Sequence, residues 1–232
     1  MSIRVLSRAA GSLLLASMLP VSAQALEQGD QMFRLGLTTM QPNPGGDDIE
    51  LELGGGGETG ELDMNSDSRP SLAFVHMLRD DVALELMGSL PFEHRLHVDE
   101  QGSGDRYSFG TLDMQQFSVS FQYYFDRFGD FRPYAGFGLH RTSFSSERID
   151  RDATQGNTDI VGFSVESTSS WLLQLGVNYS LGGDWFLNAD VRHQDMSPDV
   201  TMRYEDGAAQ DSDDFELELD PLVWTLGVGR KF

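Results

Sequence analysis

The sequence predicts an all-β fold, an eight-stranded antiparallel transmembrane β-barrel with short periplasmic turns and long extracellular loops. Three observations carry this prediction. Eight segments alternate apolar and polar residues, their connections alternate between tight turns and long polar loops, and the last segment ends on Phe232. An even number of strands with loops sorted by length is typical of outer-membrane barrels.

The eight alternating segments run over residues 31–40, 69–79, 81–98, 111–126, 131–147, 161–181, 184–204 and 214–232. In each, large apolar residues recur at every second position, which places them on one face of a strand. In the fourth segment, for example, Phe117 and Val119 alternate with Ser118 and Ser120. The segments therefore predict strands with one apolar and one mostly polar face.

The connections fall into two classes. Tight turns are predicted at 79–81, 126–130 and 182–184, where Gly and Asp are frequent. The remaining connections, near 41–68, 99–110, 148–160 and 205–213, are long, polar and rich in Gly and Asp. Short turns at one end and long loops at the other favour a membrane barrel over a secreted sandwich.

The apolar face is predicted to point outward, towards lipid. Its aromatic side chains are too large to fit together inside eight strands, whose interior only just accommodates side chains. Aromatic residues also gather beside the tight turns, as in an interfacial girdle. The predicted girdle consists of Tyr123, Tyr124, Phe131, Tyr179 and Trp185.

Composition excludes several classes of protein. Cysteine is absent, so disulfides, thiolate metal sites and cysteine nucleophiles are excluded. The chain has 37 Asp and Glu against 16 Lys and Arg, which argues against a nucleic-acid partner because phosphate binding needs a basic surface. No stretch reaches the roughly 18 apolar residues of a transmembrane helix.

The first 25 residues are predicted to be a cleaved signal peptide. Arg4 and Arg8 precede the short apolar stretch 9–19, and Ala23-Gln24-Ala25 has the small-x-small form of a signal-peptidase site. A short buried helix is the alternative interpretation. On the signal-peptide interpretation, the barrel comprises residues 26–232.

The C-terminal strand is predicted to pair with the first strand and close the barrel. Apolar residues occupy alternate positions before a terminal aromatic residue, at Trp224, Leu226, Val228 and Phe232. This pattern is typical of the signal read by the barrel-assembly machinery. Arg230 departs from it, and a long basic side chain can snorkel to lipid headgroups. The apolar pattern changes face near Pro221, which indicates a bulge or the point where the strand leaves the bilayer.

Ordered motifs along the chain resemble the OmpW family of eight-stranded outer-membrane barrels. They are RLGLTTMQPN (34–43), LMGSLPFEH (86–94), FQYYF (121–125), FRPYAGFGL (131–139), WFLNADVR (185–192) and LDPLVW (219–224). The resemblance implies a narrow barrel with an apolar interior pocket that opens to the outside. It also implies passive uptake of small hydrophobic molecules, which leave sideways through the wall into the membrane.

Alternation also predicts which side chains face the lumen. A salt-bridged plug is expected in the lower barrel, because buried charges must pair; solvated lumen charges are the alternative. The predicted plug residues are Arg34, Glu85, Arg132 and Asp190. The predicted pocket above them is lined by Met87, Phe144, Leu172, Phe186 and Val223, with ordinary lumen packing as the alternative. The resemblance adds Arg192 to this wall, where the family usually carries a bulky apolar residue.

Pro91 interrupts the third segment and removes one donor from the strand ladder. Two interpretations stay open, a simple bulge and a local gap through which the wall opens laterally.

The remaining chemistry points away from an enzyme. The histidines form no recognisable metal site or catalytic triad, and no cofactor is expected. The acidic loops favour a solvated surface, with divalent-cation bridging to lipopolysaccharide as the alternative. The sequence thus predicts a Gram-negative outer-membrane barrel for small hydrophobic solutes, in contact with lipid and lipopolysaccharide. The runner-up is a structural or interaction barrel with a filled lumen and no transport.

Overall fold

The computed structural model describes residues 26–43, 60–100, 106–125, 127–149, 160–206 and 209–232, so the predicted signal peptide lies outside the described residues. Within those ranges no helix is long and apolar enough to cross a bilayer. The strands are β1 (Gln31–Gln41), β2 (Gly60–Met64), β3 (Asp67–Met77), β4 (Val82–Ser89), β5 (Phe92–Glu100), β6 (Arg106–Tyr124), β7 (Phe131–Ile149), β8 (Ile160–Val165), β9 (Thr168–Gly182), β10 (Trp185–Gln194), β11 (Asp199–Asp206), β12 (Ala209–Glu216) and β13 (Leu222–Lys231).

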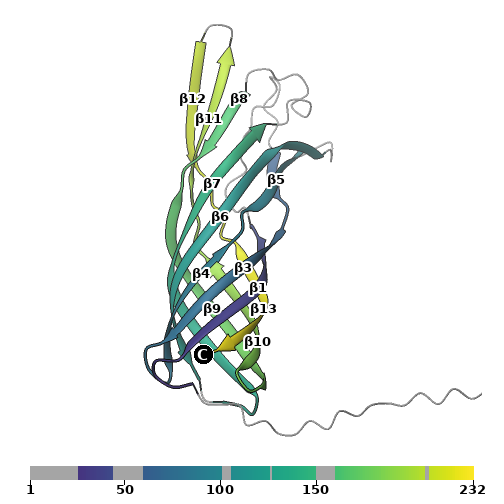
Figure 1. Ribbon diagram of the computed structural model, residues 1–232. Helices are drawn as coiled ribbons and strands as arrows, with labels where there is room; N and C mark the ends of the chain where they lie inside the picture. Colours follow the sequence, from purple (N-terminus) through teal and green to yellow (C-terminus); the bar gives the residue numbers. More distant parts are fainter. Residues whose placement is uncertain (1–25, 44–59, 101–105, 126, 150–159, 207–208) are drawn as a thin grey trace, which may run out of the picture.

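Eight strands close into a ring in the order β1-β3-β4-β6-β7-β9-β10-β13, each antiparallel to both neighbours (Figure 1). At the seam, Leu35 of β1 lies opposite Val228 of β13. The amide of Phe232 extends the seam by donating to the Gln31 carbonyl at 2.8 Å. A ring without a free edge satisfies its own backbone groups, as a hydrocarbon environment requires. The predicted eight-stranded antiparallel barrel is confirmed.

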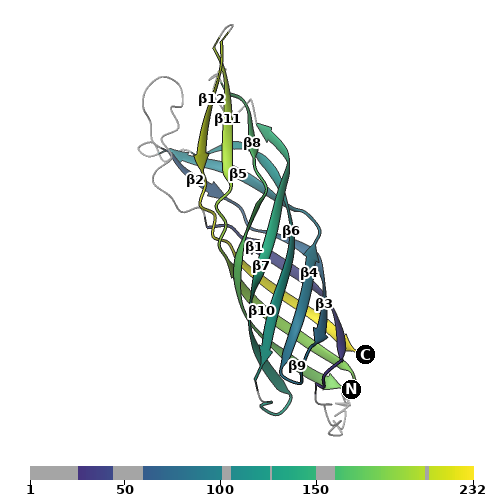
Figure 2. The same cartoon turned by 90° about the vertical axis from the view of Figure 1, so that its left-hand side faces the viewer.

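The two ends of the ring differ. Tight turns join β3 to β4, β6 to β7 and β9 to β10 at the end where the C-terminus lies (Figures 1 and 2). Gly129 and Gly183 sit in two of these turns at φ +66° and +61°, a conformation that glycine adopts without steric cost. At the opposite end, β6 and β7 continue beyond the ring (Figure 1). There β5 pairs with β6 and β2 with β5, while β8, β11 and β12 form a separate three-stranded sheet.

The long connections are therefore more ordered than the sequence suggested. β2 lies in the connection 41–68, and most of β12, which pairs with β11, lies in the connection 205–213. By contrast, β8 and β11 lie almost wholly within the predicted segments 161–181 and 184–204, each of which is divided into two strands. Segment 81–98 is two strands, divided at Leu90-Pro91, and segment 214–232 is divided by residues 217–221. Polar composition hid β2 and most of β12, whose backbone groups nevertheless find partners by pairing.

The ring has its apolar side outward. Leu226 is 69% exposed and Leu139 63%, whereas the lumen-facing Arg34 is 4% exposed. Tyr123, Phe131 and Trp185 of the predicted girdle are about half exposed near the tight turns. The placement of Tyr124 in that girdle was wrong, because it is 2% exposed and faces the lumen. A belt of exposed apolar side chains around a closed ring is the surface that lipid covers.

A charge placed in this belt tests its contact with lipid. We expect Leu226→Arg to lower the free energy of unfolding in lipid by roughly 2–4 kcal/mol, because the charge would enter hydrocarbon. The matched control is Phe128→Arg, at a side chain that is 68% exposed but lies beside a tight turn. Urea titration in lipid vesicles measures both variants, and equal losses would contradict a lipid-facing belt at Leu226.

Candidate functional site: a lumen divided by a charge cluster

A carboxylate lies at the centre of the lower lumen. Glu85 of β4 is completely buried, and both of its oxygens accept from arginines of other strands. The Arg34 Nη2 atom of β1 donates to Oε2, and the Arg192 Nη2 atom of β10 donates to Oε1 at 3.0 Å. The Arg192 Nε atom also donates to Asp190 Oδ1 at 3.0 Å. These four residues, the charge cluster, carry two positive and two negative charges.

Neutral polar side chains complete the surroundings of the charge cluster. Gln122 Nε2 donates to Glu85 Oε2 at 2.9 Å. The Tyr134 hydroxyl accepts from Arg34 Nη1 at 2.8 Å and from Asn188 Nδ2 at 3.0 Å. Buried charges are tolerated when their remaining hydrogen-bonding capacity is satisfied in this way. The charge cluster and its partners therefore reach across the lumen from β1, β4, β6, β7 and β10.

Gly176 makes room for this arrangement. A Cβ atom there would lie 2.4 Å from Cζ of Tyr134 and 2.8 Å from Cβ of Asp190. Any larger residue would displace the tyrosine that holds Arg34. Two cavities of about 10 Å³ each adjoin the charge cluster, which is space for about one water molecule.

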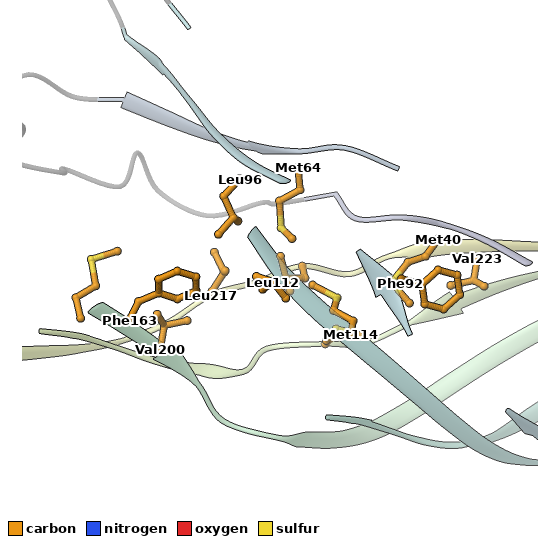
Figure 3. Packing of buried hydrophobic residues seen from close by; sticks show 13 residues of the cluster. Met40, Met64, Phe92, Leu96, Leu112, Met114, Phe163, Val200, Leu217 and Val223 are labelled. Carbon is orange, nitrogen blue, oxygen red and sulfur yellow. The ribbon is translucent and has the colours of Figure 1, made fainter. Parts of the chain in front are cut away.

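Above the charge cluster lies a buried polar layer, in which Gln116 Nε2 donates to Thr142 Oγ1 at 3.2 Å and to Gln194 Oε1 at 2.6 Å. Beyond this layer the lumen is apolar. The upper apolar cluster consists of Met40, Met64, Phe92, Leu96, Leu112, Met114, Phe163, Met196, Val200, Met202, Leu217, Leu219 and Val223. These side chains are all buried and come from the ring and its extension (Figure 3). Five of them are methionines, whose flexible thioethers adapt to irregular neighbours.

A second apolar cluster lies at the tight-turn mouth. It includes Leu26, Met32, Tyr124, Tyr134 and Phe186. Beside it is a cavity of about 60 Å³, lined in part by Arg132 and Lys231. The lumen thus has an apolar part on each side of the charge cluster.

The wall is interrupted beside the upper apolar cluster. β4 ends at Ser89 and β5 begins at Phe92, and both of these residues face the lumen, so Leu90 and Pro91 fall together on the outside. On one side the chain pairs with β3 below this point and with β2 above it, and on the other side β6 pairs with both parts. At the interruption the Leu90 amide donates to the Pro70 carbonyl at 3.0 Å. Such a change of face is the geometry of a bulge.

One ion pair and one hydrogen bond link β3 to β5 at the interruption. The ion pair joins Arg69 Nη2 to Glu93 Oε2 at 3.9 Å. Arg69 shares the lumen side of β3 because it lies opposite Thr38, yet its side chain is 35% exposed. Its Nε donates to Asp67 Oδ2 at 2.6 Å, and the same carboxylate oxygen accepts from the amide of Glu93 at 2.8 Å. The link between β3 and β5 at this point therefore depends on side-chain contacts as well as on the backbone.

The structure places the residues of the predicted pocket at different positions along the barrel axis. Met87 is 6% exposed and lines both small cavities, and Val223 belongs to the upper apolar cluster. Leu172 is buried, and Phe144 packs against the upper apolar cluster. Phe186 differs from the prediction, because it lies at the tight-turn mouth, below the charge cluster.

Two charged residues also differ from their predicted places. Arg192 belongs to the charge cluster, and it also lines the two small cavities together with Met87. Arg132 lies lower than the predicted plug, with its guanidinium 5.9 Å from the Tyr124 ring centroid and at the edge of the mouth cavity. Arg34, Glu85 and Asp190 do come together in the charge cluster. Alternation gives the face of a side chain but not its height, which depends on the stagger between tilted strands.

Sequence reasoning missed two groups. Gln122 and Tyr134 were not recognised as partners of the charges, although both alternate with lipid-facing residues. Most of the upper apolar cluster was missed as well, because its strands lie beyond the ring. The alternation of Phe92, His94 and Leu96 was the available signal.

A closed eight-stranded ring with an apolar outside and a charged, hydrogen-bonded inside defines an outer-membrane β-barrel protein. The family model for the OmpW family matches residues 27–232, and the chain belongs to that family. It is a barrel of the Gram-negative outer membrane, so the tight turns are periplasmic and the long loops extracellular.

Individual relatives agree with this assignment. Outer membrane protein W of Escherichia coli K12 is 29% identical over 223 residues, covering 95% of this chain and 97% of that protein. Outer membrane protein W of Vibrio cholerae is 27% identical, covering 96% and 97%. The crystal structure of OprG from Pseudomonas aeruginosa has the same fold, with a TM-score of 0.74 at 23% identity over 89% of this chain and 97% of that one.

Removing the central carboxylate tests how much the fold depends on the charge cluster. We expect Glu85→Gln to lower the free energy of unfolding by roughly 3–5 kcal/mol, since two buried arginines would lose their shared counter-ion. Asp184→Asn is the control, because the Asp184–Arg230 pair is exposed and 4.0 Å long and should contribute under about 1 kcal/mol. Urea unfolding followed by tryptophan fluorescence distinguishes them, and a loss below about 1 kcal/mol in both would contradict the assigned role of Glu85.

Proposed function

We propose that this barrel takes up small hydrophobic molecules passively from the outside and releases them sideways into the outer membrane. The observation that carries the proposal is the position of the wall interruption. It lies next to the upper apolar cluster and on the extracellular side of the charge cluster, so an apolar molecule in the upper lumen is close to lipid.

The charge cluster supports a lateral route over an axial one. An apolar molecule moving straight down would have to separate Glu85 from Arg34 and Arg192, leaving buried charges without partners. A move through the wall at Leu90-Pro91 meets fewer ladder hydrogen bonds, because Pro91 has no amide hydrogen. The lower-cost route therefore leads into the bilayer.

Met87, Phe144, Leu172 and Val223 are the proposed contacts of the solute along this route. Met87 lines both small cavities beside the charge cluster, and its thioether can adapt to ligands of different shape. The present cavities are too small for a solute, so uptake requires these side chains to move. Membership of the OmpW family adds the expectation of hydrophobic uptake set out from the sequence.

Several further roles belong to the same proposal. Residues 1–25 direct export and are removed, and the strand ending in Trp224, Leu226, Val228 and Phe232 is read by the barrel-assembly machinery. Lipopolysaccharide surrounds the extracellular extension. Diffusion along such a route needs no catalytic group, so the protein is not an enzyme.

The tight packing of the upper apolar cluster favours a second candidate function. All thirteen of its side chains are buried, as in a structural or interaction barrel whose lumen is permanently filled. Transport and a purely structural role differ in one measurable property, the protein-dependent uptake of apolar probes.

Enlarging one lumen side chain separates the two functions. We expect Met87→Trp to reduce uptake of an apolar fluorophore several-fold, because the indole would fill the space beside the charge cluster. Leu86→Trp is the matched control: the neighbouring side chain points outward and is 37% exposed. Uptake is measured in vesicles with a lipopolysaccharide outer leaflet. Rates equal to protein-free vesicles for the wild type would leave only the structural function.

A further inference from the structure

One imidazole lies within the upper apolar cluster. His94 of β5 is completely buried and sits on the lumen side between Phe92 and Leu96, both members of that cluster. Its ring centroid is 6.3 Å from that of Phe92. Buried polar atoms are normally hydrogen-bonded, so each of the two ring nitrogen atoms is expected to have a partner.

The structure determines which nitrogen carries hydrogen. Nδ1 lies 2.7 Å from the backbone carbonyl of Asn65. A carbonyl oxygen only accepts, so Nδ1 is the donor, and the neutral ring then presents a lone pair at Nε2. Asn65 is itself held by β5, since its side-chain oxygen accepts from the amide of Arg95. Burial lowers the pKa of His94, which keeps the ring neutral.

Nε2 of His94 is buried and has no hydrogen-bond partner. A buried acceptor without a donor is costly, and in a native fold it commonly marks a functional group. Backbone hydrogen bonds hold the ring in place, so Nε2 cannot turn towards water without breaking the bond to Asn65.

A second buried atom without a partner lies on the same path. Oγ of Ser89 has no hydrogen-bond partner, and Ser89 lines a small cavity together with Met87 and Val223. Ser89 and His94 lie on the two sides of the interruption at Leu90-Pro91. That cavity is also lined by Thr38, Gln116 and Gln194, so the lower part of the route is polar, whereas Nε2 of His94 lies among apolar side chains.

We propose that the upper lumen selects apolar molecules that carry one hydroxyl group, such as phenols and medium-chain alcohols, and that this hydroxyl donates to Nε2 of His94. The inference rests on the proposed function and narrows its solute class. A hydrocarbon would leave Nε2 without a partner, and a carboxylate would meet a lone pair in an apolar site. An ether of the same size can accept but not donate, so it also fails to satisfy Nε2.

Three aromatic probes of similar size test this selection. The purified barrel in lipid nanodiscs is titrated with 2-naphthol, naphthalene and 2-methoxynaphthalene, and binding to empty nanodiscs is subtracted. We expect 2-naphthol to bind about 3- to 10-fold more tightly than the other two, the size of effect that one hydrogen bond produces. The ¹⁵N resonance of Nε2 should shift with 2-naphthol only.

Variants assign the preference to one residue. His94→Phe should abolish it, and His94→Gln, which keeps a side-chain acceptor, should restore part of it. His193→Phe is the control, since His193 is exposed and packs on the outward-facing Trp171. If His94→Phe does not fold, the contrast among the three probes and the Nε2 shift in the wild type decide the result.

The outcomes separate the two proposals. Equal binding of all three probes to the wild type, or an unchanged preference in folded His94→Phe, would overturn the role of His94 and leave the proposed function standing. No binding of any probe above empty nanodiscs would overturn both.

Discussion

The rest of the structure depends on one buried carboxylate. Glu85 accepts from arginines of two other strands, so a single side chain links β1, β4 and β10 across the lumen. Neither arginine can leave without exposing a charge to a lumen that excludes water, which is why such a cluster is stable only when complete. The surrounding amides and the Tyr134 hydroxyl add further hydrogen bonds, so the cluster forms a partition across the lumen.

The partition gives the two halves of the lumen different properties. On the periplasmic side, an apolar cluster and a cavity of about 60 Å³ open between the tight turns. On the extracellular side, a larger methionine-rich cluster continues into strands beyond the membrane belt (Figure 3). The break at Leu90-Pro91 adjoins this second part. A molecule in the upper lumen would therefore have the charge cluster on its periplasmic side and the strand break at Leu90-Pro91 beside it.

Alternation along the chain was sufficient to predict the strands, the closing pair and the lipid-facing side, because burial in a barrel follows a period of two. It also predicted that Arg34, Glu85 and Asp190 lie close together in the lumen. It did not predict the position of a side chain along the barrel axis. Phe186 and Arg132 lie closer to the tight turns than predicted, because the stagger between strands is not visible in one sequence. It also did not predict that Arg192 pairs with Glu85 and Asp190. In the extension, polar composition concealed β2 and most of β12.

The most direct test of the account measures whether an apolar molecule reaches the bilayer or the enclosed water first. Vesicles with a lipopolysaccharide outer leaflet and the reconstituted barrel receive an apolar fluorophore from outside, with a quencher either in the bilayer or in the enclosed water. The account predicts protein-dependent quenching in the bilayer before any in the enclosed water. Earlier or simultaneous quenching in the enclosed water would contradict lateral release and show passage through the charge cluster.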